Sequence, residues 1–313
     1  MGRQLNSSAR KALFLGSKSF GLSIFKTIFE ASSHIDWTVL CPSDVGDSRS
    51  CYNDYVEFCA RHDLKLLLAY SLKEVAIEID AFAPDVMVVC GYYRILPRNV
   101  LDKVPLGVWG IHNSLLPKYR GGSPLVWQII NDEKVIGSSF FKLADGTDDG
   151  DILCQVRFQA PRDITISQAG AALEGLWIEK LSAHWARLIA GNAVATPQDH
   201  LLASYCAQRT EDDGQINWDM SAREIDCFIR AQAAPYPQAF FDYQGKKVRV
   251  VKHGADERLI YGTPGQVFSR TVSGEVIVVC GGSSALRLVE VRTEECTCPA
   301  GEVLDSLSIR LKS

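Results

Sequence analysis

Short apolar runs alternate with helical patterns through the first 190 residues, and this alternation restricts the fold more than any other feature of the sequence. The runs at 11–16 and 85–91 are aliphatic and end in glycine, while Leu22, Phe25 and Phe29 recur at helical spacing. Further strands are expected at 37–41, 64–70, 107–112 and 138–143, and further helices at 52–62, 73–81, 124–130 and 166–188. Strands that alternate with helices predict an α/β fold with a mostly parallel sheet and helices on both faces.

The pattern changes beyond a connector near 191–205, where helical periodicity fades. One helix is expected from Ser221 to Ala231, with Glu224 placed to complete a capping box. Four β-rich runs bounded by glycine turns follow it, which predicts a small β-barrel or sandwich. The expected organisation is a first domain at 1–195, a linker at 196–208 and a second domain at 209–313.

The composition is typical of a globular protein, with 47% hydrophobic and 22% charged residues. The net charge of −4 provides no strong positive field for nucleic acid or anionic lipid. No apolar run reaches the roughly 18 residues of a membrane helix, and no signal-peptide pattern is present. The ten cysteines form no disulfide framework, and the only close pair, Cys296 and Cys298, has no matching ligands elsewhere. A cytoplasmic protein without a metal is therefore expected.

The segment from Gly107 to Leu153 carries the residues suited to chemistry. His112 ends an apolar strand, where an α/β sheet usually places its active site. The acidic turn DGTDDGD at 145–151 follows the next strand. A histidine and a carboxylate at two strand ends form a candidate acid–base pair. The residues alone are also compatible with an ordinary hydrogen-bonded histidine and a solvated acidic turn.

The motif IHNSLLPKYRGGSP at 111–124, followed by DGTDDGDIL at 145–153, resembles the formyltransferase family that uses N10-formyltetrahydrofolate. LFLGSKSFGLSIF at 13–25 looks like the first strand of that family, and GYYRILPRNVL at 91–101 looks like its folate-side loop. The segment at 208–240 resembles the start of the C-terminal domain of methionyl-tRNA formyltransferases. The same domain follows the module that formylates 4-amino-arabinose on a uridine nucleotide.

The resemblance implies an N-formyltransferase with a Rossmann-like catalytic domain and an OB-like C-terminal barrel. The acceptor amine then attacks the formyl group directly, without a covalent intermediate. His112 matches the histidine that stabilises charge on the formyl oxygen, and Asp148 matches the aspartate that orients it. Gly110 stands where the family has asparagine, so one donor, worth roughly 3–4 kcal/mol by analogy with oxyanion holes, is missing. Asn113 is the nearest alternative, although strand alternation points it away from Gly110 and His112.

The folate-side residues are also carried over from the resemblance. The residues expected to bind N10-formyltetrahydrofolate are Tyr92, Tyr93, Ile95, Leu96, Pro97, Asp145 and Asp148. Their alternative role is to pack a strand-to-helix turn on the core. Arg94 is expected near the glutamate tail of the folate, or simply in solvent.

The loop after His112 is expected to bind the acceptor. The residues expected there are Ser114, Lys118, Tyr119, Arg120, Gly121 and Gly122. The Arg120 guanidinium suits a phosphate or a sugar hydroxyl, and its alternative role is to tie the loop to nearby carboxylates.

Charge bears on the choice of acceptor, because tRNA binding depends on basic surfaces. Residues 209–313 contain 13 basic and 15 acidic side chains, and residues 41–65 contain three and five. The local patch of Lys246, Lys247, Arg249 and Lys252 is the exception, and its alternative role is that of an exposed strand with solvated lysines. The expected acceptor is a small molecule, a nucleotide-linked amino sugar, with no membrane partner. Methionyl-tRNA, hydroxyornithine and a folate-binding pseudoenzyme are the alternatives, and a homodimer stays open.

Overall fold

The structure is a computed structural model that describes residues 8–44, 47, 49–92 and 94–312. The chain divides into two compact units. Unit 1 comprises the residues up to 124 together with 135–158 and 171–206. Unit 2 comprises 125–134, 159–170 and the residues from 207 onward. Two short segments from within the expected first domain therefore group with the C-terminal part, a division that the sequence analysis does not foresee.

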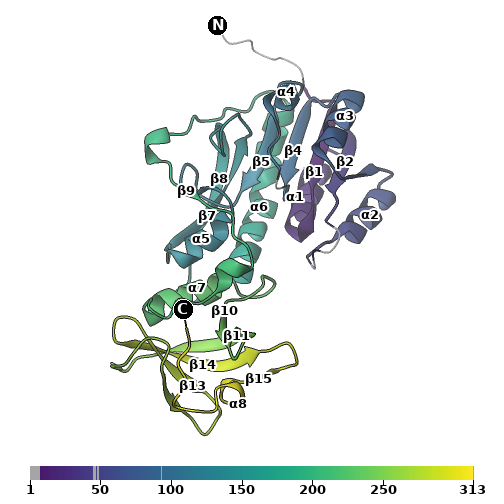
Figure 1. The fold of residues 1–313 in the computed structure, drawn as a ribbon. Helices are drawn as coiled ribbons and strands as arrows, with labels where there is room; N and C mark the ends of the chain where they lie inside the picture. Colours follow the sequence, from purple (N-terminus) through teal and green to yellow (C-terminus); the bar gives the residue numbers. More distant parts are fainter. Residues whose placement is uncertain (1–7, 45–46, 48, 93, 313) are drawn as a thin grey trace. The chain divides into compact units, whose positions relative to one another are not determined.

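Unit 1 is built on one sheet of seven strands. The strands are β1 Lys11–Gly16, β2 Asp36–Pro42, β3 Lys65–Ala69, β4 Val86–Cys90, β5 Val108–His112, β7 Val135–Lys142 and β8 Ile152–Gln159. Their order in the sheet is β3-β2-β1-β4-β5-β7-β8 (Figure 1). Strands from β3 to β5 pair in parallel, and β7 runs antiparallel to β5. The predicted mostly parallel sheet is confirmed.

Helices cover both faces of this sheet. Successive side chains of a strand point to opposite sides, so an apolar strand such as β1 presents apolar side chains to a helix on each face. The helices are α1 Lys18–Glu30, α2 Tyr52–Arg61, α3 Leu72–Phe82, α4 Arg98–Leu101 and α6 Ile166–Ile189. Phe14 of β1 packs on Phe25 of α1, with ring centroids 4.9 Å apart. Leu13 and Leu15 instead join the apolar cluster that contains Val75 of α3.

The long helix α6 is fixed to unit 1 by two buried tryptophans. Trp185 donates its indole N–H to Ser32 Oγ at 2.8 Å, and Trp177 donates to Ser138 Oγ at 3.0 Å. These bonds satisfy the one polar group of each otherwise apolar side chain. Within the described part of the chain, no helix has both the length and the apolarity needed to cross a membrane.

Unit 2 contains a curved antiparallel sheet. Its elements are α5 Pro124–Ile130, η2 Asp212–Gly214, α7 Ala222–Ala231, β10 Phe240–Tyr243, β11 Lys246–Asp256, β12 Val267–Arg270, β13 Val276–Cys280, β14 Ser284–Arg292, β15 Thr297–Pro299 and α8 Ala300–Val303. The strand order is β10-β11-β14-β13-β12, with β15 on β14 (Figure 1). Trp218, Phe241 and Leu288 lie in its core. The sheet curls as a half-barrel, which agrees with the expected OB-like domain.

Helix α7 begins as the sequence predicts. Ser221 Oγ accepts the N–H of Glu224, and the Glu224 carboxylate accepts the N–H of Ser221 at 2.8 Å. This capping box satisfies two donors at the helix start that have no partner within the helix. The helix then buries Ile225, Phe228 and Ile229.

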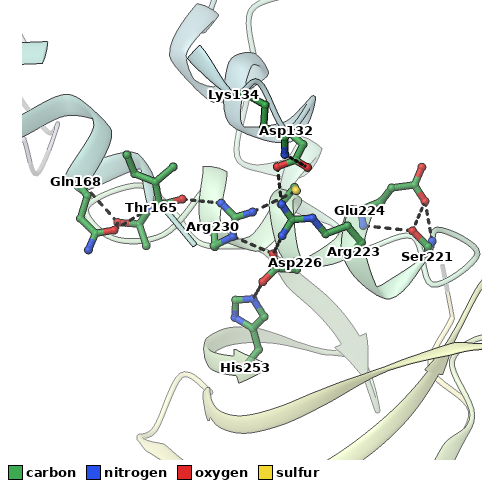
Figure 2. Close-up of polar contacts among 12 residues, drawn as sticks. Asp132, Lys134, Thr165, Gln168, Ser221, Arg223, Glu224, Asp226, Arg230 and His253 are labelled. Atoms are coloured by element: carbon green, nitrogen blue, oxygen red, sulfur yellow. Dashed lines mark hydrogen bonds and ion pairs between the residues drawn. The ribbon is translucent and has the colours of Figure 1, made fainter. Parts of the chain in front are cut away.

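A polar network centred on Asp226 fixes α7 within unit 2 (Figure 2). The Asp226 carboxylate accepts hydrogen bonds from Arg230 Nε at 2.9 Å and Arg223 Nη1 at 3.0 Å. His253 of β11 lies against the same carboxylate, with Nε2 at 3.0 Å from Oδ1. One acidic side chain therefore holds the helix to the sheet.

The two arginines extend this network to the segments 125–134 and 159–170 of unit 2 (Figure 2). Arg223 Nη2 donates to Asp132 Oδ1 at 2.5 Å, and Arg230 Nη1 donates to the Ile164 carbonyl oxygen at 2.6 Å. Arg230 is only 6% exposed, so these bonds offset the cost of burying its charge. Segments 125–134 and 159–170 are thereby attached to α7.

Acid is expected to weaken unit 2. Burial acts to raise the pKa of Asp226, but bonds from His253 and Arg230 outweigh it and lower the pKa. For Asp132, burial likewise acts to raise the pKa, and Arg223 and Lys134 lower it to about 2. Because both folded pKa values lie below the unfolded value, the stabilisation is present above about pH 4 and is lost as pH falls through the folded values.

This prediction is checked by urea unfolding between pH 2 and 6. The unfolding free energy is expected to fall more steeply with acid in the parent protein than in Asp226→Asn. If the unfolding free energy depends on pH in the same way in the two proteins, the role of Asp226 in the acid sensitivity is contradicted.

Candidate active site

His112 and Asp148 come together, as the sequence analysis expects. His112 ends β5, and its Nδ1 lies 3.5 Å from Asp148 Oδ2. Its other nitrogen, Nε2, lies 2.7 Å from the Tyr119 carbonyl oxygen. A carbonyl oxygen accepts only, so Nε2 carries the hydrogen. Nδ1 is therefore the ring nitrogen not used by that bond, and the Asp148 carboxylate faces it.

Asp148 is held by the loop at 113–122, which is called the acceptor loop after its predicted role. Its Oδ2 accepts the N–H of Gly121 at 2.8 Å, and its backbone is left-handed, with φ of 49°. Gly121 has φ of 101°, and a Cβ there would lie 2.5 Å from the Cys206 carbonyl oxygen. Only glycine fits this close approach. In this structure Gly121 supports the carboxylate.

Of the other residues predicted to bind the acceptor, some support the loop and one is exposed to solvent. Ser114 is fully buried and donates its hydroxyl to the Lys118 carbonyl oxygen at 2.6 Å. The N–H of Gly122 bonds the Cys206 carbonyl oxygen at 3.0 Å. The Lys118 side chain is exposed. Lys118 is therefore free to meet a ligand, whereas Ser114 shapes the loop.

Arg120 is placed differently from the expected phosphate contact. It is 1% exposed, and Gln198 Oε1 accepts from its Nε at 3.1 Å and its Nη2 at 2.7 Å. Nη1 lies 3.3 Å from the Tyr205 hydroxyl. The guanidinium therefore ties the loop to a neighbouring segment. The partner is an amide, however, and not the carboxylate that the alternative role requires.

The folate-side loop contains both buried and exposed residues. Leu96 lies in the apolar core cluster, and Pro97 precedes α4. Ile95 is 82% exposed. Asp145 lies on the exposed acidic turn and binds Arg98 at 2.6 Å. Tyr93 lies outside the described residues.

Among the described residues of this loop, Tyr92 has a buried polar group without a hydrogen-bond partner. Its hydroxyl is buried without a hydrogen bond from the described residues, and burial raises its pKa although Arg94 opposes this. A buried hydroxyl without a partner costs free energy, so such a group is a candidate ligand contact.

A cavity of about 240 Å³ opens beside Tyr92, at the carboxyl ends of β1 to β4. Lys18 borders it, with Nζ bound to Asp44 at 2.6 Å and Asp47 at 2.8 Å. Burial acts to lower the Lys18 pKa, but the two carboxylates raise it. The cavity lies where the strand order reverses between β1 and β4, the usual ligand position of such sheets. Sequence reasoning missed Lys18, Asp44 and Asp47, although the rule that ligands bind at the carboxyl ends of parallel strands could have located them.

Comparison with known proteins decides the family. Residues 51–176 match the formyl transferase model, and residues 209–306 match its C-terminal domain. The methionyl-tRNA formyltransferase of Chloroflexus aggregans is 33% identical over 286 residues, covering 90% of this chain and 92% of that protein. The chain belongs to the formyltransferase family. It is a transferase of formyl groups.

Solved structures of formyltransferases share the fold. WlaRD, a sugar 3N-formyl transferase studied with dTDP and 5-N-formyl-THF, has a TM-score of 0.66 at 16% identity, over 91% of this chain and 97% of its own. The N-formyltransferase from Helicobacter canadensis, in complex with folinic acid and dTDP-3-aminofucose, has a TM-score of 0.65 at 17% identity, over 88% and 98%. At these identities the likeness concerns the fold alone.

In this formyltransferase the place of the expected asparagine is filled by an apolar side chain. A Cβ on Gly110 would lie 2.7 Å from Leu143 Cδ1 and 3.5 Å from Phe141 Cε1. Asn113 turns to β7, where its Oδ1 accepts from Ser138 Oγ at 3.0 Å. Leu143, which lies 33 positions further along the chain, occupies the space of the missing carboxamide.

Gly110→Asn alone is expected to cost about 1–3 kcal/mol of stability, because the new side chain overpacks Leu143. Gly110→Asn with Leu143→Ala is expected to recover most of this loss. The added carboxamide is also expected to raise kcat by about tenfold over Leu143→Ala alone, as a donor toward the formyl oxygen. Urea unfolding and steady-state kinetics on the three variants check this. A stable single variant, or no gain in the double, would contradict it.

Proposed function

We propose that this formyltransferase moves the formyl group of N10-formyltetrahydrofolate to the amine of a nucleotide-linked amino sugar. The folate supplies the electrophilic formyl carbon. The loop from Tyr92 to Pro97 fits it, because a buried hydroxyl without a partner and the outward Ile95 offer one polar and one apolar contact. Asp145 and Asp148 border the same side by the family resemblance.

The His112–Asp148 pair supports direct transfer. The acceptor nitrogen forms its bond to the formyl carbon while the bond from that carbon to the donor nitrogen breaks. The acceptor nitrogen loses one proton to His112 Nδ1, and the imidazolium returns a proton to the departing donor nitrogen, so that tetrahydrofolate leaves as an amine. Asp148 Oδ2, 3.5 Å away, stabilises the imidazolium that results. In these reaction steps no residue of the chain forms a covalent bond to the formyl group.

One observation carries the choice of a small acceptor: three of the four basic side chains in the patch at 246–252 are already paired with carboxylates. Glu211 binds both Lys247 and Arg249, the former at 3.2 Å. Lys246 lies 3.4 Å from Glu295. Binding a phosphate chain there requires these pairs to be broken, which reduces the gain in affinity. Lys18 in unit 1 is held in the same way by Asp44 and Asp47.

Methionyl-tRNA is the second candidate acceptor, and a specific observation favours it. The relatives with substantial identity, such as the enzyme of Chloroflexus aggregans, are named methionyl-tRNA formyltransferases. Sugar formyltransferases resemble this chain at 16–17% identity. The two acceptors differ in charge, so their binding differs in salt dependence.

The test is a panel of acceptors incubated with the purified protein and N10-formyltetrahydrofolate. The panel holds UDP-, dTDP- and GDP-linked amino sugars, hydroxyornithine and charged initiator tRNA. Mass spectrometry reports the gain of one formyl group. Formylation of one amino sugar supports the proposal, and formylation of tRNA alone replaces it with the second candidate. Folate binding without transfer to any acceptor would favour the pseudoenzyme alternative.

A further inference from the structure

Residues 196–206 form a strap across the two loops that carry the active-site pair, all within unit 1. At one end, Thr196 and Ile152 exchange two backbone hydrogen bonds of 2.8 Å. At the other, β9 Tyr205–Cys206 pairs with β6 Arg120–Gly121. The segment expected to be a linker is therefore hydrogen-bonded into the catalytic unit at both ends.

Gln198 lies in the middle of the strap and connects the two loops through one carboxamide. Its Nε2 donates to the carbonyl oxygens of Asp148 at 2.8 Å and Gly150 at 2.7 Å. Its Oε1 accepts from Arg120 Nε and Nη2. Gln198 is 6% exposed, so both ends of the amide are satisfied inside the protein. The acidic turn and the acceptor loop are thus held at a fixed separation.

The strap also supports two residues in unfavourable backbone conformations. Asp148 has φ of 49° and Tyr119 has φ of 59°. Left-handed backbone at residues other than glycine costs of order 1–3 kcal/mol and persists only where surrounding bonds enforce it. Gln198 binds the carbonyl oxygen of Asp148, and Ser204 Oγ accepts the N–H of Tyr119 at 2.9 Å.

Each of these two residues touches His112 directly. The Tyr119 carbonyl oxygen lies 2.7 Å from Nε2, and Asp148 Oδ2 lies 3.5 Å from Nδ1. A displaced acidic turn would move the carboxylate away from Nδ1. A displaced Tyr119 would rotate the imidazole.

We propose that Gln198 is a positioning residue for formyl transfer, which sets the distance between the Asp148 carboxylate and His112. Ser204 completes the arrangement by fixing Tyr119. The strap then acts more on turnover than on binding of the formyl donor, since it holds only the acidic turn of the proposed donor site. The inference rests on formyltransferase activity and on no particular acceptor.

Gln198→Glu is the decisive variant, because it separates the two ends of the amide. A carboxylate keeps the bonds to Arg120 but has no N–H for Asp148 and Gly150, and it places charge against their carbonyl oxygens. Misplacement near 1 Å typically costs up to about 10² in rate, so kcat is expected to fall about 10–100-fold. KM for the formyl donor is expected to change less than kcat. Gln168→Glu is the matched control, since Gln168 is exposed, lies in unit 2 and caps a helix through its oxygen.

A spectroscopic readout makes the test independent of the acceptor and of global unfolding. The imidazole ¹⁵N and ¹H signals of His112, assigned with His112→Gln, are expected to shift in Gln198→Glu and to a smaller degree in Ser204→Ala. They are expected to stay in place in Gln168→Glu. A thermal midpoint close to the parent value shows that the unit remains folded. Parent-like His112 signals in Gln198→Glu, or a loss confined to KM, would overturn the proposal.

Discussion

His112→Ala is expected to lower kcat/KM for formyl transfer by about 10²–10⁴, and Asp148→Asn by about 10². Alanine removes the group that, in the proposed mechanism, receives the proton from the acceptor amine. The asparagine variant keeps the shape but loses the negative charge that faces Nδ1 at 3.5 Å. Removal of the base therefore has the larger effect.

Steady-state kinetics with the acceptor that reacts in the panel measure both variants. His34→Ala is the matched control, because His34 is exposed in unit 1 and lies outside the residues assigned to the site. The double variant is expected to be no slower than His112→Ala alone, since Asp148 acts through the imidazole. Activity of His112→Ala within about fivefold of the parent would contradict this role for the pair.

Asp226→Ala is expected to lower the free energy of unfolding of unit 2 by about 3–5 kcal/mol. The substitution leaves the buried Arg230 guanidinium without its carboxylate, and a buried charge without a counter-charge is costly. Arg223 and His253 lose the same partner (Figure 2). The site residues belong to unit 1, so residual activity of folded protein is expected to persist.

Urea unfolding followed by circular dichroism measures this loss. Asp242→Ala is the control, because Asp242 is an exposed aspartate on β10 of the same sheet. It is expected to change stability by less than about 0.5 kcal/mol. A loss below about 1 kcal/mol in Asp226→Ala would show that the network contributes little beyond surface ion pairs.

The strands and helices of unit 1 follow closely from local sequence. The expected helix at 52–62 is α2 at Tyr52–Arg61, and the expected strand at 11–16 is β1 at Lys11–Gly16. The capping box at Ser221 marks the start of α7 correctly. These features depend on hydrophobic periodicity and on bonds between residues three or four positions apart, which a sequence displays directly.

Other parts of the fold escape that kind of reasoning. Strand β8, Ile152–Gln159, is absent from the expected elements, although it forms one edge of the sheet. The segments 125–134 and 159–170 belong with unit 2 because of bonds to α7 that span 66 and 91 positions. No local pattern identifies the partner of such a bond.

The sequence by itself determined the α/β class and a β-rich second domain and, through the family resemblance, the OB-like form of that domain and the pairing of His112 with Asp148. Only the tertiary structure decided that Arg120 is buried against Gln198, that Leu143 fills the space beside Gly110, and that residues 196–206 strap the site. The physical reason is sequence separation. Periodicity reports which face of an element is buried, whereas the distant side chain that meets that face is chosen when the chain packs.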